Sequence, residues 1–258
     1  ANSHRTVKAG DWHPPKGIYD CDLDIFDWVI DPLSDADKSL FMSYKETKSH
    51  RKTRFKSFDC SIMELADDIA YSIHDLEDAI VMGMVSKGLF EKEVTEALIA
   101  CGNDWIRQHM ITTTDKLFSD VHYLRKNAIG ALVNAFITDI EIQQVDPGFE
   151  NPILKYNAVH NENMSSALKV LKRFVYEHVI RNAQIQRFEY KGQQMVMELF
   201  DALASDPKRF LPPNTVSRWK ECTSESSQMR VLADYVSGMT DEYASKMYSD
   251  LFLPKHTR

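Results

Sequence analysis

Long stretches of this sequence carry apolar residues at intervals of three and four, and few residues interrupt them. Glycine and proline number only nine each among the 258 residues. Both residues break helices, whereas apolar residues at these intervals line one face of a helix. The sequence therefore predicts an all-α fold. The alternation at Ile140 and Ile142, followed by Ile153, leaves room for one short β-hairpin.

Breaks in the apolar pattern suggest how the chain is divided. Pro32-Leu33-Ser34 interrupts a first helical region, in which we expect Ser34 to cap the second helix. Turn residues cluster again at 147–152, where the helical pattern fails. We therefore expect a division into residues 1–145 and 146–258. Other helices are predicted at about 57–86, at 91–109, from a cap at Thr113 or Thr114 onward and at 226–252. Residues 165–204 are predicted to form one long helix or a broken pair.

The composition narrows the class of protein. No apolar run approaches the roughly 20 residues of a membrane span, and the four cysteines show neither a CxxC pair nor a zinc-like spacing. These features predict a soluble, cytoplasmic protein without disulfides. A net charge of −7 argues against bulk binding of nucleic acid; single-stranded DNA stays possible as a partner but is not indicated. The absence of an initiator Met and the polar first 16 residues suggest an internal, processed or engineered start.

The segment from Glu64 to Asp78 is the most informative for chemistry. At about 100° per residue, its polar side chains fall within an arc of roughly 100°, and its aliphatic side chains lie on the other side. The polar side chains are Asp67, Tyr71, His74, Asp75 and Asp78. Periodicity alone would also fit an ordinary solvated helix face with an exposed tyrosine.

A basic block precedes this acidic face. Its cations are Lys45, Lys48, Arg51, Lys52, Arg54 and Lys56, with His50 among them. A carboxylate that holds a divalent cation, beside side chains that hold phosphate oxygens, suits the hydrolysis of a phosphate ester or anhydride. A solvated loop would have the same composition, so the block alone does not decide between the two interpretations.

Five segments, in order along the chain, resemble the dGTPase-like branch of the HD-superfamily phosphohydrolases. The central one is SFDCSIMELADDIAYSIHDLEDAI, at 57–80. The others are PPKGIYDCDLDIFDWV at 14–29, NPILKYN at 151–157, FVYEHVIRNAQIQRFEYKG at 174–192 and DYVSGMTDEYA at 234–244. The resemblance covers nearly the whole chain and implies the later helices of an HD domain, followed by a helical HD-associated domain.

The resemblance implies roles for three residues of the central segment. Asp67 falls on the last metal ligand of the family, and Tyr71 and Asp75 fall on positions that recognise the sugar 3′-hydroxyl of the nucleotide. His74-Asp75 is not the family's His-Asp dyad, because the family's dyad lies upstream of this whole chain. The catalytic residues are therefore also expected upstream, and this chain alone is expected to be inactive. The metal implied is Mg or Mn, although these ligands would also suit Fe.

The resemblance also suggests which cations hold the triphosphate. Those in the basic block are Arg51, Lys52 and Arg54. Arg181 and Lys191 lie in the segment that resembles the family's nucleotide-facing helix, where they would otherwise be surface residues of an amphipathic helix.

The function implied is hydrolysis of a deoxynucleoside triphosphate (dNTP) to a deoxynucleoside and inorganic triphosphate, by a protein that forms homo-oligomers. Two alternatives stay open. Another HD-superfamily nucleotidase or phosphodiesterase would act on monophosphates or diesters and would not need the basic block. A noncatalytic oligomerisation or regulatory module would keep the helical scaffold without the upstream His and His-Asp ligands.

Overall fold

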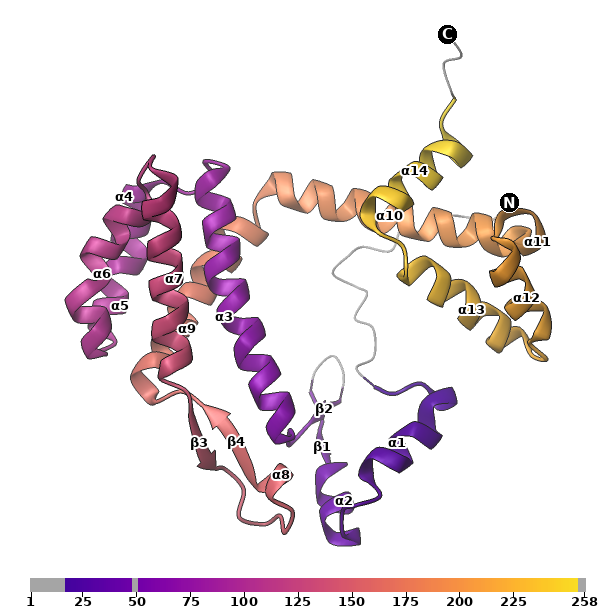
Figure 1. Cartoon of the computed structure of the whole chain (residues 1–258), viewed down its shortest axis with the longest axis horizontal. Helices are drawn as coiled ribbons and strands as arrows, with labels where there is room; N and C mark the ends of the chain where they lie inside the picture. The colour runs from indigo at the N-terminus through magenta and orange to yellow at the C-terminus, as the bar shows by residue number, and fades with distance from the viewer. Residues whose placement is uncertain (1–16, 48–50, 255–258) are drawn as a thin grey trace. The chain divides into compact units, whose positions relative to one another are not determined.

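The computed structural model describes residues 17–47 and 51–254, and in these residues the chain is mainly helical (Figure 1). The predicted helical fold is confirmed. The interpretations of residues 1–16, Lys48 and His50 concern positions outside the described residues. Within the described part of the chain, no helix is long and apolar enough to cross a membrane.

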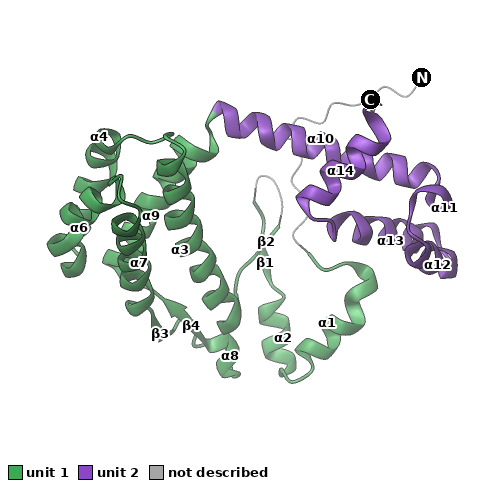
Figure 2. Ribbon diagram, turned by 45° about the horizontal axis from the view of Figure 1, so that its top comes forward, with its two compact units in different colours: residues 1–182 green, residues 183–258 purple. Residues whose placement is uncertain are grey.

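The chain divides into two compact units, residues 1–182 and 183–258 (Figure 2). The first contains η2 (Asp20–Asp22), α1 (Leu23–Ile30), α2 (Asp35–Phe41), β1 (Tyr44–Lys45), β2 (Lys52–Thr53), α3 (Phe58–Val81), α4 (Lys87–Phe90), the π-helix η3 (Glu91–Thr95), α5 (Glu96–Ala100), α6 (Asp104–Leu117), α7 (His122–Thr138), β3 (Glu141–Gln144), α8 (Pro152–Lys155), β4 (Tyr156–Val159), α9 (Glu162–Val175) and the π-helix η4 (Tyr176–Ile180). These two units are the parts of the chain that are compact in space. The division expected between residues 145 and 146 concerns the family's domains and stays a prediction.

Local capping explains where several helices begin and end. Ser34 caps α2 as expected, because its side chain accepts a hydrogen bond from the backbone N–H of Asp37. Ser57 caps α3 in the same way, through the N–H of Cys60. After Val81 the chain turns at Gly83, whose φ of 68° lies in the left-handed region. The helix predicted at 57–86 is therefore about five residues shorter in the structure.

The region predicted as one helix at 91–109 is two segments. Gly102 adopts a φ of 88°, which ends the first segment, and Asn103 then caps α6 by accepting from the N–H of Ile106. The expected cap at Thr113 or Thr114 was wrong, because both residues lie inside α6 and are buried. The hydroxyl of Thr114 instead forms a buried hydrogen bond with the Thr95 hydroxyl, at 3.0 Å.

Two small antiparallel sheets accompany the helices in the described residues. The predicted strand around Ile142 is β3, which pairs with β4 in the register Glu141↔Val159 to Gln144↔Tyr156. Ile153 lies in α8 between the strands, so the partner strand begins three residues later than the alternation suggested. The second sheet, β1 with β2, was not predicted, because two-residue strands have no alternation to detect.

Helix α3 lies at the centre of the first unit, where it packs against α7, α9 and β4 (Figure 1). One side of α3 is core: Ile73 and Leu76 are fully buried, and Ile69 and Ala79 nearly so. Burial of each isoleucine or leucine side chain contributes roughly 1.5–3 kcal/mol. The buried Glu77 carboxylate pairs with Lys126 of α7 at 2.9 Å, which adds a polar link between the two helices.

The second unit contains α10 (Ala183–Ser205), α11 (Pro207–Phe210), α12 (Pro213–Glu221), α13 (Glu225–Ser237) and α14 (Asp241–Phe252). Its core has Leu203, Leu211 and Leu232 at the centre, with aromatic and methionine side chains packed around them. The helix predicted at 226–252 is in fact α13 and α14, which are separated at Gly238 and begin anew at the Thr240 cap.

Candidate functional site

The polar face of α3 forms as the sequence predicted. Asp67 and His74 are exposed. Tyr71, one turn after Asp67, and Asp75, one turn after Tyr71, are half-buried. Because Tyr71 also packs against the main hydrophobic cluster, its ring is held while its hydroxyl end remains near the surface. This helix face therefore offers a free carboxylate, then a phenol and then a second carboxylate, at intervals of one helical turn.

Burial and neighbouring charges alter the acidity of two of these groups. Burial raises the pKa of the Asp75 carboxyl above its usual value, as does the nearby Asp78 carboxylate, whereas His74 opposes the shift. Burial also raises the pKa of the Tyr71 phenol, with further contributions from Asp75 and from Tyr176 of η4. Tyr71 is therefore protonated at neutral pH and can donate a hydrogen bond while Asp75 accepts one.

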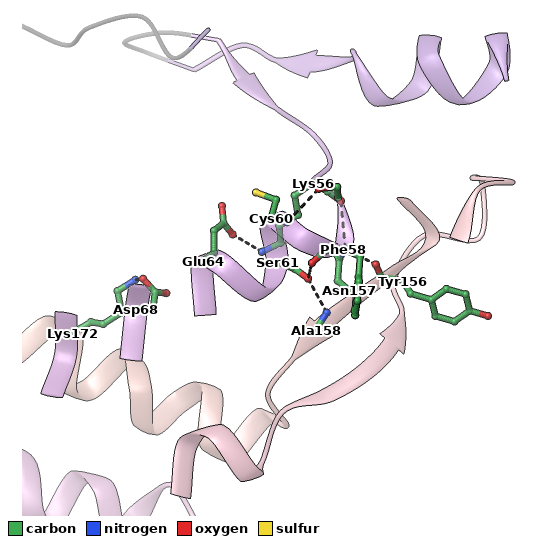
Figure 3. A network of polar contacts seen from close by, with 11 residues as sticks. Lys56, Phe58, Cys60, Ser61, Glu64, Asp68, Tyr156, Asn157, Ala158 and Lys172 are labelled. Atoms are coloured by element: carbon green, nitrogen blue, oxygen red, sulfur yellow. Dashed lines mark hydrogen bonds and ion pairs between the residues drawn. The ribbon is translucent and has the colours of Figure 1, made fainter. Parts of the chain in front are cut away.

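The beginning of α3 is connected to β4 by hydrogen bonds around Ser61 and Asn157 (Figure 3). The Ser61 hydroxyl is fully buried; it donates to the Phe58 carbonyl at 2.6 Å and accepts the backbone N–H of Ala158 at 2.8 Å. The Asn157 side-chain amide donates to the Lys56 carbonyl at 3.4 Å and to the Tyr156 carbonyl at 2.7 Å. Of these bonds, the one between Ala158 and Ser61 joins β4 directly to the first turn of α3, and the one from Asn157 to Lys56 joins β4 to the residue two positions before the helix.

Two ion pairs lie beside the polar face of α3. Lys56 Nζ is 2.6 Å from Glu64 Oε2, and Lys172 Nζ of α9 is 2.5 Å from Asp68 Oδ1, as Figure 3 shows. A pocket of about 390 Å³ lies between α3, β4 and α9, and all four of these side chains line it. Asp68 directly follows Asp67 in α3, but their side chains point about 100° apart around the helix axis, and Asp67 is not among the residues that line this pocket.

The cations predicted from the basic block lie in and next to β2. Arg51 pairs with Glu46 at 3.1 Å, and its guanidinium lies over the Tyr44 ring, with 4.3 Å between the guanidinium carbon and the ring centroid. Lys52 is exposed in β2. Arg54 lines a different pocket, of about 290 Å³, together with Asp146 and Asn157. Neither of these two pockets contains Asp67, Tyr71 or Asp75 in its lining.

The two predicted cations further along the chain lie in different units. Arg181 is exposed at the end of η4, in the same unit as α3. Lys191 lies in α10 of the second unit and is also exposed. The roles suggested for both residues stay predictions.

The described residues supply only one of the ligands that a metal ion would need at the predicted site. A carboxylate oxygen such as that of Asp67 is a suitable ligand for Mg or Mn. Among the described residues, however, no three His, Cys, Asp or Glu side chains gather in a way that could hold a metal ion. His74 is directed toward Glu77, with 3.9 Å between Nδ1 and Oε2. The described residues thus supply at most a share of a metal site.

Three residues beside α3 were absent from the predicted site, namely Lys169, Lys172 and Tyr176. They recur at intervals of three and four on one face of α9 and η4, so periodicity could have indicated a shared stripe. It could not have indicated which helix faces that stripe. The contact between Lys172 and Asp68 joins residues 104 positions apart, and it depends on how α3 and α9 pack.

A family match and several similar proteins relate this chain to phosphohydrolases. Residues 158–250 match the family described as the phosphohydrolase-associated domain. The deoxyguanosinetriphosphate triphosphohydrolase-like protein of Aliivibrio fischeri strain MJ11 is 52% identical to this chain over 259 residues, which cover 97% of the chain and 58% of the relative. The protein with the same description from Shewanella sp. strain MR-4 is 54% identical over 260 residues, covering 98% and 58%.

A third relative, from Vibrio cholerae and described as deoxyguanosinetriphosphate triphosphohydrolase-like protein 1, is 49% identical over 96% of this chain and 57% of its own length. The chain therefore spans somewhat more than half the length of the curated relatives that it matches. The resemblance inferred from five sequence segments is confirmed. This chain is a homologue of the deoxyguanosinetriphosphate triphosphohydrolase-like proteins over somewhat more than half of their length, and its residues 158–250 match the phosphohydrolase-associated domain.

Proposed function

We propose that this chain is part of a metal-dependent hydrolase that converts a dNTP to a deoxynucleoside and inorganic triphosphate. One observation carries the proposal: Asp67, Tyr71 and Asp75 share one accessible face of α3, in a homologue of proteins named for dGTP hydrolysis. Half-buried groups that hydrogen-bond a substrate hydroxyl discriminate strongly against analogues without it. Tyr71 and Asp75 therefore recognise the deoxyribose in this proposal.

Asp67 contributes one ligand to a Mg or Mn ion, and the other ligands come from outside the described residues. When bound, such an ion activates water and neutralises charge on the phosphates. The chain's own contribution is to hold the Asp67 carboxylate on a rigid helix, which is anchored to β4 through Ser61 and to the core through Ile73 and Leu76.

The test is release of inorganic triphosphate from each of the four dNTPs, with Mn or Mg, by the natural full-length protein. Asp67→Ala is expected to abolish metal-dependent release while leaving the helical circular dichroism unchanged. Asp59→Ala is the matched control, because Asp59 is an exposed carboxylate of the same helix that lies outside the polar arc. Undiminished release by Asp67→Ala would overturn the assignment of the metal ligand.

The same assay distinguishes the alternative activities. If nucleoside monophosphates or phosphodiesters are cleaved while dNTPs are not, the protein is another kind of phosphohydrolase. In that case, replacement of Arg51, Lys52 and Arg54 should leave the activity unchanged. If the full-length protein cleaves none of these substrates with either metal, a noncatalytic role replaces the proposal.

A further inference from the structure

The pocket between α3, β4 and α9 has a cationic lining that the sequence did not reveal. Lys56, Lys169 and Lys172 contribute three positive charges, against the two carboxylates of Glu64 and Asp68. The pocket therefore has a net charge of about +1 at neutral pH, although the whole chain has a formal charge of −7. Such a pocket attracts anions in spite of the charge of the protein as a whole.

The two ion pairs leave most of the lysine hydrogen-bond donors available. Each ammonium has three N–H donors, and Lys56 and Lys172 each direct one to a carboxylate. The side chains of both pairs are between 37% and 58% exposed, and ion pairs this accessible are worth only about 0–1 kcal/mol. An arriving anion can therefore share or displace these contacts at little cost, while the carboxylates keep the ammonium groups in place.

Lys169 adds a third cation one turn before Lys172 on α9, and within the described part of the chain no ion-pair partner is found for it. The Ser165 side chain, a further turn back, also lines the pocket and offers a hydroxyl donor. The uncharged part of the lining includes Leu65 and Leu168. Lysine is a common phosphate ligand in proteins, where it acts as a point charge, so a lining with several lysines and a hydroxyl suits a phosphate group.

The position of the pocket relates it to the proposed substrate. Along α3, Asp68 lies about 4.5 Å before Tyr71, and Glu64 about 10 Å before Tyr71, given the rise per helical residue. In the proposed function the metal ligand Asp67 lies one turn before Tyr71, so a nucleotide whose sugar contacts Tyr71 and Asp75 would extend its phosphates toward the beginning of α3. The phosphates would then meet Lys172 and Lys56 on the side of the helix that faces α9.

We propose that this pocket binds the phosphate chain of the substrate, with Lys172 as its principal cation. This inference rests on the proposed function and names a cation site that differs from the cations predicted from the sequence. The ligand class is an oligophosphate, either free inorganic triphosphate or the phosphate chain of a dNTP.

The experiment measures binding of sodium tripolyphosphate, dGTP and deoxyguanosine to the full-length protein by calorimetry, with EDTA present to exclude metal ions. Tripolyphosphate and dGTP are expected to bind competitively, with an affinity that falls as salt increases. If only dGTP binds, the nucleoside rather than the phosphate chain supplies the affinity, and the proposal is wrong. Deoxyguanosine alone should not compete with tripolyphosphate.

Two variants test the role of Lys172. Lys172→Gln is expected to weaken tripolyphosphate binding by about tenfold or more, as expected from loss of a charge-assisted hydrogen bond. The double variant Lys172→Gln with Asp68→Asn keeps an amide pair between α3 and α9 and leaves the net charge unchanged, and it should be weakened similarly. Arg173→Gln is the control: it removes one charge from the next residue, which pairs with Glu177 at 3.0 Å and lines a different pocket.

The two proposals can fail separately. Unchanged tripolyphosphate binding by both Lys172 variants would overturn the phosphate pocket, even if dNTP hydrolysis dependent on Asp67 were found. Tripolyphosphate binding that depends on Lys172 in a protein that hydrolyses no dNTP would retain the pocket and overturn the proposed function.

Discussion

Removal of the Ser61 hydroxyl should loosen the link between α3 and β4 much more than removal of a similar hydroxyl elsewhere in α3. Ser61 and Ser72 are both fully buried, and each donates to a carbonyl within its own helix. Only Ser61 also accepts a hydrogen bond from another element, the backbone N–H of Ala158, which is itself 4% exposed. Ser61→Ala and Ser72→Ala are therefore a matched pair.

The expected magnitudes follow from the groups left without partners. Ser61→Ala leaves the buried N–H of Ala158 unpaired, at a cost of about 1–3 kcal/mol. Ser72→Ala removes only the hydrogen bond from the Ser72 hydroxyl to the Asp68 carbonyl, and no buried N–H loses its partner. Its cost is therefore on the order of 0.5 kcal/mol. The gain in helix propensity from Ser to Ala is similar for both variants and cancels in the comparison. With about 2 kcal/mol for Ser61→Ala and about 0.5 kcal/mol for Ser72→Ala, the difference in unfolding free energy should be about 1.5 kcal/mol.

Amide hydrogen exchange is the most direct assay, because the chain has two compact units and global unfolding need not be a single transition. For Ser61→Ala, exchange at the Ala158 amide should accelerate by about 30-fold, the equivalent of 2 kcal/mol. For Ser72→Ala it should change by less than about threefold. Equal acceleration in the two variants, or an unchanged Ala158 amide in Ser61→Ala, would refute the view that this hydrogen bond anchors α3 to β4.

Three further predictions concern charge and assembly. Because burial and Asp78 raise the pKa of Asp75, ionisation of Asp75 opposes folding. The unfolding free energy of the wild type should therefore fall relative to that of Asp75→Asn as the pH rises above 3.8. Urea titrations at several pH values measure this, and an equal pH dependence of the two proteins would contradict it. Glu77→Gln should lower the unfolding free energy by about 1 kcal/mol, because the ion pair between the buried carboxylate and the half-exposed Lys126 is lost. Thermal denaturation of the variant and the wild type measures this loss, and an unchanged midpoint would argue against a stabilising pair. We still expect a homo-oligomer, and Trp28 of α1, which is 75% exposed, is a candidate contact between its subunits. Light scattering of the wild type should give a multiple of the chain mass, and Trp28→Ser should give a smaller mass. A monomeric wild type would contradict this expectation.

The sequence by itself determined the features that depend on neighbours within about one helical turn. The helical class, the cap at Ser34, and the polar face with Asp67, Tyr71 and Asp75 all arise from spacing and from side chains that bond to nearby backbone groups. The five segments that resemble dGTPase-like phosphohydrolases also indicated the proteins to which this chain is related. Strong short-range patterns of this kind persist because tertiary packing reinforces them.

Only the tertiary structure decided which groups lie beside that polar face. Lys172 reaches Asp68 across 104 residues, and Ser61 meets Ala158 across 97, so no local pattern could have revealed either contact. The break inside 91–109 is different, because Gly102 and the Asn103 cap are local signals that the interpretation of this region as one helix overlooked. Periodicity fixes the face of a helix on which a side chain lies, whereas its partner is fixed by how the helices pack, and packing depends on the whole core.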